Sequence, residues 1–284
     1  MHAEFKKYRL KFRSPVKFFG QTLAERSGFL LRISHENRIV EGEIPFFPTM
    51  PQNEIERNIA TIKDYLSKEN LNLPVPPRLS VPFAFGLSSC LLALRSDADL
   101  DFSRVKSYPF YQSISDCTSK DSFPKVKFSG TASEISAINS AEGEKFRLDF
   151  NRRLNFDEAC KLLTKIDLNN ILYIEEPISD IKLLPKLKRR FDFSLALDET
   201  VINRELTSEM LNLADYLIIK PALIGDFDYI AQLAASGKQI VFSSAYESKI
   251  GTDAIRRLIC MHRLERSPHG LDTEKYIEKF EVEP

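Results

Sequence analysis

Between residues 144 and 220 the sequence repeats one pattern, which recurs as EKFRLDF (144–150), NILYIE (170–175), FSLALD (193–198) and YLIIK (216–220). Each run is short and rich in aliphatic or aromatic residues, and an amphipathic stretch separates it from the next. Strands that alternate with helices predict βαβ units and a parallel sheet. Helices cover both faces of such a sheet, which agrees with the nearly continuous hydrophobicity of these runs.

The same rhythm extends to three further runs, VKSYPFY (105–111), FPKVKF (123–128) and QIVFSS (239–244). In a (β/α) barrel the carboxyl ends of all strands converge on one mouth, where such enzymes place their catalytic groups. One strand, one helix and two loops fit a period of 22 to 26 residues, and that period separates six polar residues at or near successive run ends: Lys127, Asp149, Glu175, Asp198, Lys220 and Ser243. We therefore expect these six residues at a single site.

The first third of the chain follows another pattern. Residues 4–12, 28–33 and 38–44 are short apolar runs separated by polar or glycine-containing turns, which predicts an antiparallel meander. Residues 52–67 carry isoleucine and leucine at helical spacing, and residues 81–94 are apolar on nearly every face, as in a buried helix.

These two patterns predict two domains, an α+β capping domain over residues 1–95 and a barrel over residues 96–284. The C-terminal tail is free to return to the capping domain. A chain of 284 residues is long enough for one barrel-sized domain or for two unequal domains.

The overall composition points to a small-molecule partner. With 40 basic and 40 acidic residues the formal net charge is zero, so no global field favours nucleic acid or an anionic membrane. The N-terminus lacks the apolar core of a signal peptide, and no stretch of about 18 uncharged apolar residues occurs. We expect a cytoplasmic protein with no membrane partner and no obligatory protein partner.

Three of the six strand-end residues, Asp149, Glu175 and Asp198, are carboxylates on consecutive strands. Crowded at one mouth, they repel one another unless a cation lies between them. The four cysteines and four histidines show no metal-ligand spacing, so any metal must be held by oxygen, which suits Mg²⁺. The alternative is that each acid caps a helix or pairs with a lysine. We expect the adjacent Glu176 and Glu199 to point elsewhere, behind the site or on the surface.

The lysines suggest the chemistry. Lys125 and Lys127 are two residues apart in a strand, so both side chains face the same way. Their repulsion and a nearby divalent cation are expected to lower the pKa of Lys127 from about 10.4 towards a value useful in a base. Lys220 faces the same mouth from the far side. A metal that binds a substrate carboxylate stabilises the enediolate left when the α-proton is removed, and a lysine supplies the base. The alternative for each lysine is an exposed strand end.

Eight segments, in this order along the chain, resemble motifs of one enzyme family. Each alone occurs by chance in many chains, and their specificity lies in their order and spacing. The chain is similar to members of the enolase superfamily, in its muconate-cycloisomerase-like branch, and most of all to the o-succinylbenzoate synthases. The segments are VEGEIP (40–45), KVK (125–127), RLDFNR (147–152), IEEP (174–177), LDE (197–199), IKP (219–221), SSAYESKIG (243–251) and GLDT (270–273).

The resemblance implies a fold and a role for each matched residue. The fold is a modified (β/α)7β barrel with an N-terminal α+β capping domain. Asp149, Glu175 and Asp198 would bind Mg²⁺, with Mn²⁺ as a possible substitute, and Lys127 would be the acid and base. Lys220 would stabilise the substrate electrostatically from the opposite face. Contacts to a small-molecule carboxylate substrate would come from Lys125, Arg147 and Asn151, and from backbone amides near Ser243, Ser244 and Gly270.

The implied reaction is the syn dehydration of 2-succinyl-6-hydroxy-2,4-cyclohexadiene-1-carboxylate to o-succinylbenzoate in menaquinone biosynthesis. Residues 13–27, where relatives carry a substrate-covering loop, offer no motif that aligns. Three alternatives stay open. An N-succinylamino acid racemase, dipeptide epimerase or cycloisomerase shares the same lysines and carboxylates. An aldolase barrel would use Lys220 as a metal-free Schiff base. A barrel without chemistry would serve only in binding.

Overall fold

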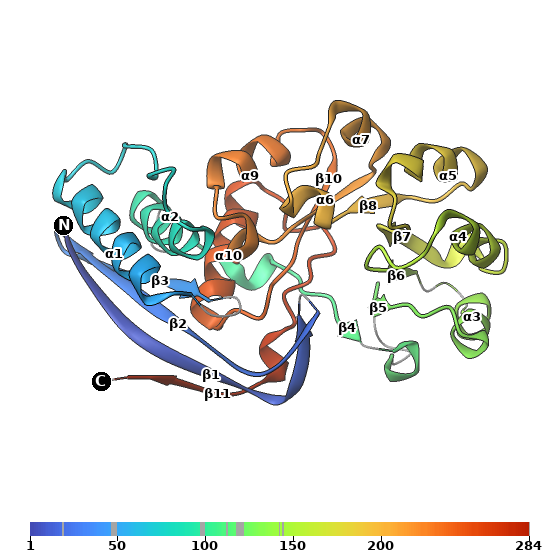
Figure 1. The fold of residues 1–284 in the computed structure, drawn as a ribbon, viewed down its shortest axis with the longest axis horizontal. Helices are drawn as coiled ribbons and strands as arrows, with labels where there is room; N and C mark the ends of the chain where they lie inside the picture. The colour runs from blue at the N-terminus through green and yellow to red at the C-terminus, as the bar shows by residue number, and fades with distance from the viewer. Residues whose placement is uncertain are drawn as a thin grey trace.

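The computed structural model describes residues 1–18, 20–46, 50–96, 100–111, 113–117, 122–141, 143 and 145–283. These residues form two sheets, one antiparallel and four-stranded, the other parallel and seven-stranded. In Figure 1 the antiparallel sheet extends to the left of the barrel, and both chain ends lie at its far end. The parallel sheet curls on itself, with helices on its outer side. The fold is therefore the capped (β/α) barrel that the sequence predicts.

The four-stranded sheet has the order β11-β1-β2-β3 and consists of β1 (His2–Phe18), β2 (Gln21–His35), β3 (Arg38–Pro45) and β11 (Ile277–Val282). The predicted meander is confirmed, but β1 and β2 are much longer than predicted. They continue as a ribbon to the pair Phe18 and Gln21, so residues 13–27 form a hairpin, although the part of the tip at residue 19 lies outside the described residues. Strand β11 pairs with β1 and brings the C-terminal tail back to this sheet.

Two helices cover one face of this sheet. They are α1 (Gln52–Ser67) and α2 (Val81–Arg95), and both match their predicted ranges to within one residue. Leu31 and Ile33 of β2 pack against Ile62 of α1 and Phe83 of α2, all fully buried. This apolar layer makes the sheet and its helices a stable unit. The domain division at residue 95 stays a prediction.

All seven predicted runs of the barrel are strands. In the sheet order β10-β9-β8-β7-β6-β5-β4, neighbouring strands are also consecutive in the chain, and every pair is parallel. Sequential βαβ units build neighbouring parallel strands in this way. The strands are β4 (Phe110–Tyr111), β5 (Lys125–Lys127), β6 (Phe146–Asp149), β7 (Ile171–Glu175), β8 (Leu195–Leu197), β9 (Tyr216–Ile219) and β10 (Gln239–Phe242).

Short helices connect these strands. Two of them begin with capping boxes, Thr131 with Glu134 and Asn155 with Glu158, which satisfy the free amides of the first turn. The α-helices are α3 (Ala132–Asn139), α4 (Phe156–Leu163), α5 (Leu184–Arg190), α6 (Glu199–Ile202), α7 (Ser208–Leu213), α8 (Pro221–Ile224), α9 (Phe227–Ala234) and α10 (Lys249–Met261). The 3₁₀ turns are Phe102–Arg104, Ile114–Asp116, Leu168–Asn170, Ile181–Leu183 and Glu274–Tyr276.

The barrel is closed by two residues that follow α10. His269 forms a parallel bridge with Ser107, ahead of β4, and Gly270 forms one with Ser243, after β10. The Tyr108 amide donates to the His269 carbonyl at 2.9 Å, and the Ser244 amide donates to the Gly270 carbonyl at 2.9 Å. Residues 269 and 270 thus take the place of an eighth strand, too short to show as a hydrophobic run in the sequence.

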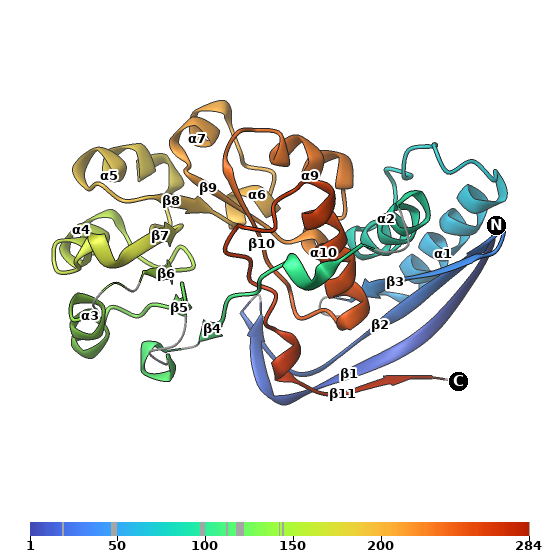
Figure 2. The ribbon, with the colours of Figure 1, turned by 180° about the vertical axis from the view of Figure 1, so that it is seen from behind.

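The capping sheet is fastened to the barrel by a group that we call the cap latch, formed by Glu43, Tyr8, Ser248 and Gly251. The buried Glu43 carboxylate accepts hydrogen bonds from the Tyr8 hydroxyl at 2.6 Å and from the Ser248 and Gly251 amides at 2.8 and 3.1 Å. Ser248 and Gly251 lie at the start of α10, where an acid is favoured by the helix dipole. The view from behind shows β3 and α10 side by side (Figure 2).

No helix in the described part of the chain is long and apolar enough to cross a membrane. The predicted cytoplasmic location stays a prediction.

Candidate active site

The candidate site is a cleft of about 600 Å³ at the carboxyl ends of the barrel strands. Its barrel wall includes Lys127, Asp198 and Lys220, and its other wall includes Lys17 and Gly20 from the hairpin of the capping sheet. The three barrel residues lie here because the carboxyl ends of parallel strands all lie at the same edge of the sheet. The capping sheet reaches the cleft only because β1 and β2 are long.

The three predicted metal ligands lie on adjacent strands. Asp149 ends β6, Glu175 ends β7 and directly pairs with Asp149 in register, and Asp198 follows β8. All three are buried. Burial raises the pKa of Glu175 well above its usual value, and the charge of Asp149 raises it further. Such crowding disfavours three negative charges and calls for a cation among them.

Two lysines supply positive charge to these carboxylates in the described structure. Lys125 Nζ lies 2.8 Å from Glu175 Oε1 and 3.0 Å from Asp149 Oδ2, and Lys220 forms an ion pair with Asp198. Among the described residues no three His, Cys, Asp or Glu side chains are arranged to enclose a metal as they stand. The lysine contacts account for this, since they occupy carboxylate oxygens that a metal would otherwise bind.

Two carboxylate oxygens of the cluster nevertheless have no hydrogen-bond partner in the part of the chain that the structure describes. They are Glu175 Oε2 and Asp198 Oδ1, both buried. A buried acceptor without a donor is costly, and native structures rarely keep one without a reason. Hard oxygen ligands with free lone pairs are the donor set that Mg²⁺ prefers. Asp149, Glu175 and Asp198 therefore fit a divalent cation, provided that Lys125 and Lys220 turn partly aside.

Lys127 and Lys220 differ in their electrostatic surroundings. Burial lowers the pKa of Lys127, Asp149 partly opposes this, and the charge of Lys125 lowers it again. The predicted direction is thus confirmed, although burial rather than repulsion is the largest cause. Burial is also the largest influence on the pKa of Lys220 and lowers it, but the charges of Asp198, Glu175 and Glu199 together outweigh it, so the net pKa is raised. Lys127 Nζ lies 5.9 Å from the centre of the Phe110 ring, in a cation–π position.

Two further acids, Glu176 and Glu199, directly follow proposed metal ligands in the chain, and only Glu176 lies where the sequence predicts. Glu176 is fully buried behind the site, within the range of the prediction. Glu199 lines the cleft, so the expectation that it points elsewhere is wrong. Its position at the start of α6, directly after Asp198, turns it back into the mouth. Burial raises the pKa of Glu199 from 4.5 to about 7, and the charge of Asp198 adds to this.

Arg147 and Asn151 stand close to the ligands in different roles. Arg147 is fully buried, and its guanidinium donates to the Phe123, Pro268 and Pro109 carbonyls at 2.6, 2.7 and 3.1 Å. Those donors hold the barrel together, and Arg147 also lines the cleft. Its predicted contact with a substrate stays a prediction. The backbone amide of Asn151 donates to Asp149 Oδ1 at 3.0 Å and so orients that carboxylate.

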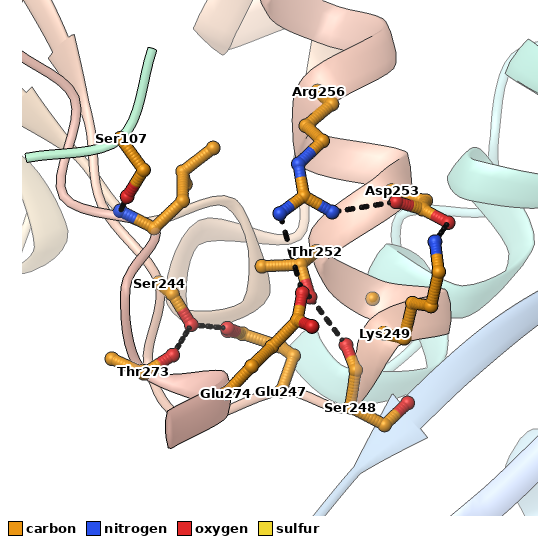
Figure 3. A network of polar contacts seen from close by, with 12 residues as sticks. Ser107, Ser244, Glu247, Ser248, Lys249, Thr252, Asp253, Arg256, Thr273 and Glu274 are labelled. Atoms are coloured by element: carbon orange, nitrogen blue, oxygen red, sulfur yellow. Dashed lines mark hydrogen bonds and ion pairs between the residues drawn. The ribbon is translucent and has the colours of Figure 1, made fainter. Parts of the chain in front are cut away.

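The segment around Ser243, Ser244 and Gly270 lines the cleft as predicted, but not with free amides. Those three amides donate to the Ile219, Gly270 and Phe242 carbonyls, each at 2.9 Å. These three amides are therefore used in hydrogen bonds within the barrel. The predicted contact of amides near these residues with a substrate carboxylate stays a prediction. Figure 3 shows why the segment is rigid: Ser244 Oγ lies between Glu247 and Thr273, 2.6 Å from Thr273 Oγ1.

Comparison with known families agrees with this geometry. The model of the enolase C-terminal domain-like family matches residues 111–278, which is more than half of the chain. The chain belongs to this family. The match begins in β4 and continues through the segments that carry all three carboxylates and the three lysines of the site.

Individual relatives of this enolase-like chain carry two kinds of name. An o-succinylbenzoate synthase of Aliivibrio fischeri is 25% identical over 302 residues, covering 95% of this chain and 90% of the relative. The crystal structure of o-succinylbenzoate synthase from Thermosynechococcus elongatus BP-1, complexed with Mg in the active site, is similar with a TM-score of 0.74, 22% identity, and 98% and 95% coverage. The L-Ala-D/L-Glu epimerase from Bacillus subtilis has a TM-score of 0.72, 18% identity, and 98% and 91% coverage. At these identities the two structures establish the enolase-like fold alone.

Sequence reasoning missed several residues of the enolase-like cleft. Lys17 and Phe18 come from the hairpin, where no motif marks them. Arg153 lines the cleft two residues after Asn151, and its guanidinium donates to the Phe150 carbonyl at 3.0 Å. Tyr246 lies within a segment that was recognised, and its ring packs against Phe18 with centroids 5.9 Å apart. The spacing of strand ends marks only residues on strands, so residues from loops and from the cap escape it.

Proposed function

We propose that the protein is an o-succinylbenzoate synthase, which dehydrates 2-succinyl-6-hydroxy-2,4-cyclohexadiene-1-carboxylate to o-succinylbenzoate in menaquinone biosynthesis. The observation that carries the proposal is the asymmetry of the two lysines. Lys127 is half-buried with a lowered pKa, whereas the carboxylates around Lys220, Asp198 foremost, raise its pKa and hold it as a cation. One proton carrier and one fixed charge suit a dehydration at a single face of the substrate. The Aliivibrio relative, which spans nearly the whole chain, bears the same name.

Asp149, Glu175 and Asp198 would hold Mg²⁺. When bound, the ion would bind the substrate carboxylate and stabilise the negative charge that develops on it. Binding would draw Asp198 and Glu175 away from Lys220 and Lys125, whose ammonium groups would remain as a positive rim around the substrate. The unpartnered oxygens of Glu175 and Asp198 support this assignment.

Lys127 would move both protons of the reaction. As the free amine it takes the α-proton beside the substrate carboxylate, and the electron pair of that C–H bond enters the ring. The hydroxyl at the neighbouring carbon then departs with the electrons of its C–O bond, and the Lys127 ammonium returns the proton to it as water. Both steps occur on one face, so a single lysine suffices, and the product ring is aromatic.

Lys220 would not exchange protons in this reaction. Its pairing with Asp198, which follows β8, would put a positive charge across the carboxylates from Lys127 on β5. From there it lowers the energy of negative charge on the ring and the carboxylate. A cation over an aromatic face is also favourable once the product ring forms.

A dipeptide epimerase or related racemase is the second candidate. The observation that favours it is the similarity to the Bacillus subtilis epimerase, whose TM-score of 0.72 is close to the 0.74 of the synthase. A racemase that works in both directions needs a proton carrier on each face of the substrate. Lys220 would have to lose its proton for that role, against the raised pKa that Asp198 gives it.

The deciding experiment is conversion of the cyclohexadiene substrate by purified protein, followed by loss of its absorbance and by chromatography of the product. We expect turnover with Mg²⁺ and none in EDTA. The turnover rate of Lys127→Ala should be lower than that of wild type by roughly 10²–10⁴-fold or more, the usual contribution of a general acid–base group. Its circular dichroism spectrum should be unchanged. The exposed Lys6 gives a matched control, since Lys6→Ala should retain full activity.

Two results would contradict the proposal. Full activity of Lys127→Ala, or of wild type in EDTA, would rule out the mechanism. If the wild type leaves this substrate unchanged but exchanges the α-proton of N-succinylamino acids or dipeptides in D₂O, the second candidate is correct.

A further inference from the structure

We infer that Glu176 and Arg152 form a positioning brace, which fixes the three carboxylates of the barrel mouth in the geometry that binds the metal. Neither residue is among those that line the cleft. The inference rests on the proposed function, because it requires a divalent cation at Asp149, Glu175 and Asp198. Its physical basis is a set of contacts that joins the ends of β6, β7 and β8 behind the site.

The Glu176 carboxylate fixes the backbone of a proposed ligand. Glu176 follows Glu175 at the end of β7, and its side chain is fully buried. Its Oε1 accepts from the amide of Asp198 at 2.9 Å and from the amide of Thr200 at 2.8 Å. The Asp198 side chain therefore leaves a backbone whose position is set from the neighbouring strand.

Arg152 ties the third strand end to the same carboxylate. It stands three residues after Asp149, and its guanidinium forms an ion pair with Glu176 Oε2. It also donates to Thr200 Oγ1 at 2.7 Å and to Glu205 Oε2 at 3.0 Å, and its backbone amide donates to the Glu176 carbonyl at 3.0 Å. Contacts to three successive strand ends thus meet at one buried ion pair.

The backbone at these strand ends also requires support. Asn151, Arg152 and Glu176 have φ angles of 49°, 54° and 33°, in the left-handed region that favours glycine. Non-glycine residues persist there only when surrounding contacts hold them, and such positions cluster at functional sites. The brace supplies those contacts at two of the three positions. A buried ion pair contributes little net stability against an apolar replacement, so its use here is geometric.

A second ion pair on the same strand provides a matched control. Asp215 Oδ2 accepts from Lys188 Nζ and from the Leu195 amide, both at 2.8 Å, so it too joins a cation to an amide of β8. It does so at the start of the strand, at the opposite end from Asp198. Loss of this pair tests what a purely structural ion pair contributes.

The test is the dissociation constant of Mg²⁺ for the metal-free protein, measured by isothermal titration calorimetry. Glu176→Gln and Arg152→Lys should each weaken Mg²⁺ binding by about 10–100-fold, the usual effect of removing a group that orients a ligand. Asp215→Asn should stay within about twofold of wild type. At saturating Mg²⁺ the brace variants should recover kcat to within a few-fold, because the reacting groups are intact.

A double variant tests whether Glu176 and Arg152 act together. Because the two residues act through one contact, Glu176→Gln with Arg152→Lys should weaken binding no more than the weaker-binding single variant does. Folded brace variants that bind Mg²⁺ within twofold of wild type, or losses that multiply in the double variant, would overturn the brace alone. A wild type that binds no Mg²⁺ would overturn the proposed function and the brace together.

Discussion

The cap latch and the barrel mouth both bury carboxylates, and the two regions treat them differently. In the latch, Glu43 Oε1 accepts from Tyr8, and Oε2 accepts from the amide and hydroxyl of Ser248 and from the amide of Gly251. At the mouth, Glu175 Oε2 and Asp198 Oδ1 are buried without a hydrogen-bond partner. The latch uses both oxygens of Glu43 to join the capping sheet to the barrel, whereas two carboxylate oxygens of the mouth have no hydrogen-bond partner among the described residues.

This difference separates a structural carboxylate from a functional one. A buried acid with all its acceptors used stabilises the fold, and removing it leaves donors unpaired. A buried acid with free acceptors and a raised pKa is kept at a cost in stability, which is characteristic of ligand and catalytic sites. The comparison yields the following predictions.

The largest expected difference is in stability. Glu43→Gln should lower the free energy of unfolding by about 3 kcal/mol, because an amide NH₂ would face donors that now bind a carboxylate. Glu175→Gln should change it by less than about 1 kcal/mol in EDTA, since the variant removes repulsion with Asp149 as well as the contact with Lys125. Urea unfolding followed by circular dichroism measures both. Equal losses in the two variants would contradict the distinction between latch and mouth.

Metal should stabilise the mouth and leave the latch unaffected. At a Mg²⁺ concentration 100 times its Kd, ligand binding adds about 2.7 kcal/mol to the free energy of unfolding. Wild type and Glu43→Gln should gain this increment, and Asp198→Asn should gain much less. Thermal unfolding with Mg²⁺ and with EDTA tests it. An increment of the same size in Asp198→Asn would place the ion elsewhere.

A third prediction is a pH dependence at Glu199. Burial raises the pKa of its carboxyl from 4.5 to about 7, so between these values the folded state binds a proton that the unfolded state has lost. The contribution of Glu199 to stability therefore falls as pH rises from 4.5 to 7 and is constant above. In EDTA, the free energy of unfolding of wild type minus that of Glu199→Gln should fall over this range. His269, with its pKa lowered to about 4, acts in the opposite direction but cancels in the difference. A difference that is flat with pH would contradict the buried state of Glu199.

Local patterns in the sequence predict the parts of the fold that local physics determines. The seven strands, α1 and α2 follow from hydrophobic periodicity, and the register of parallel strands then brings Lys127, Asp149 and Glu175 together. The full hairpin of β1 and β2 does not follow from this pattern, because residues 13–27 carry only scattered apolar residues, and Val16 pairs with Leu23 of the same segment. The pairing of β1 with β11 is also invisible locally, since it joins opposite ends of the chain.

The site was predictable where a residue ends a strand and not where its partners are remote. The family resemblance assigns Arg147 to substrate contact, and it does not indicate that three distant carbonyls accept hydrogen bonds from Arg147 inside the barrel. Lys125 reads as a substrate contact too, and in the described structure it lies between Asp149 and Glu175. Its substrate role stays a prediction. Glu43 lies in a recognised turn motif, but its partner Ser248 is 205 residues away.

The most direct test of the central claim, that the carboxylates with free oxygens hold a divalent cation, is the number of Mn²⁺ ions bound per chain, measured by electron paramagnetic resonance. One tightly bound ion is expected in wild type and in folded Glu43→Gln, and none in Glu175→Gln. Tight binding of one ion by Glu175→Gln, or its loss in Glu43→Gln while the barrel stays folded, would contradict the account.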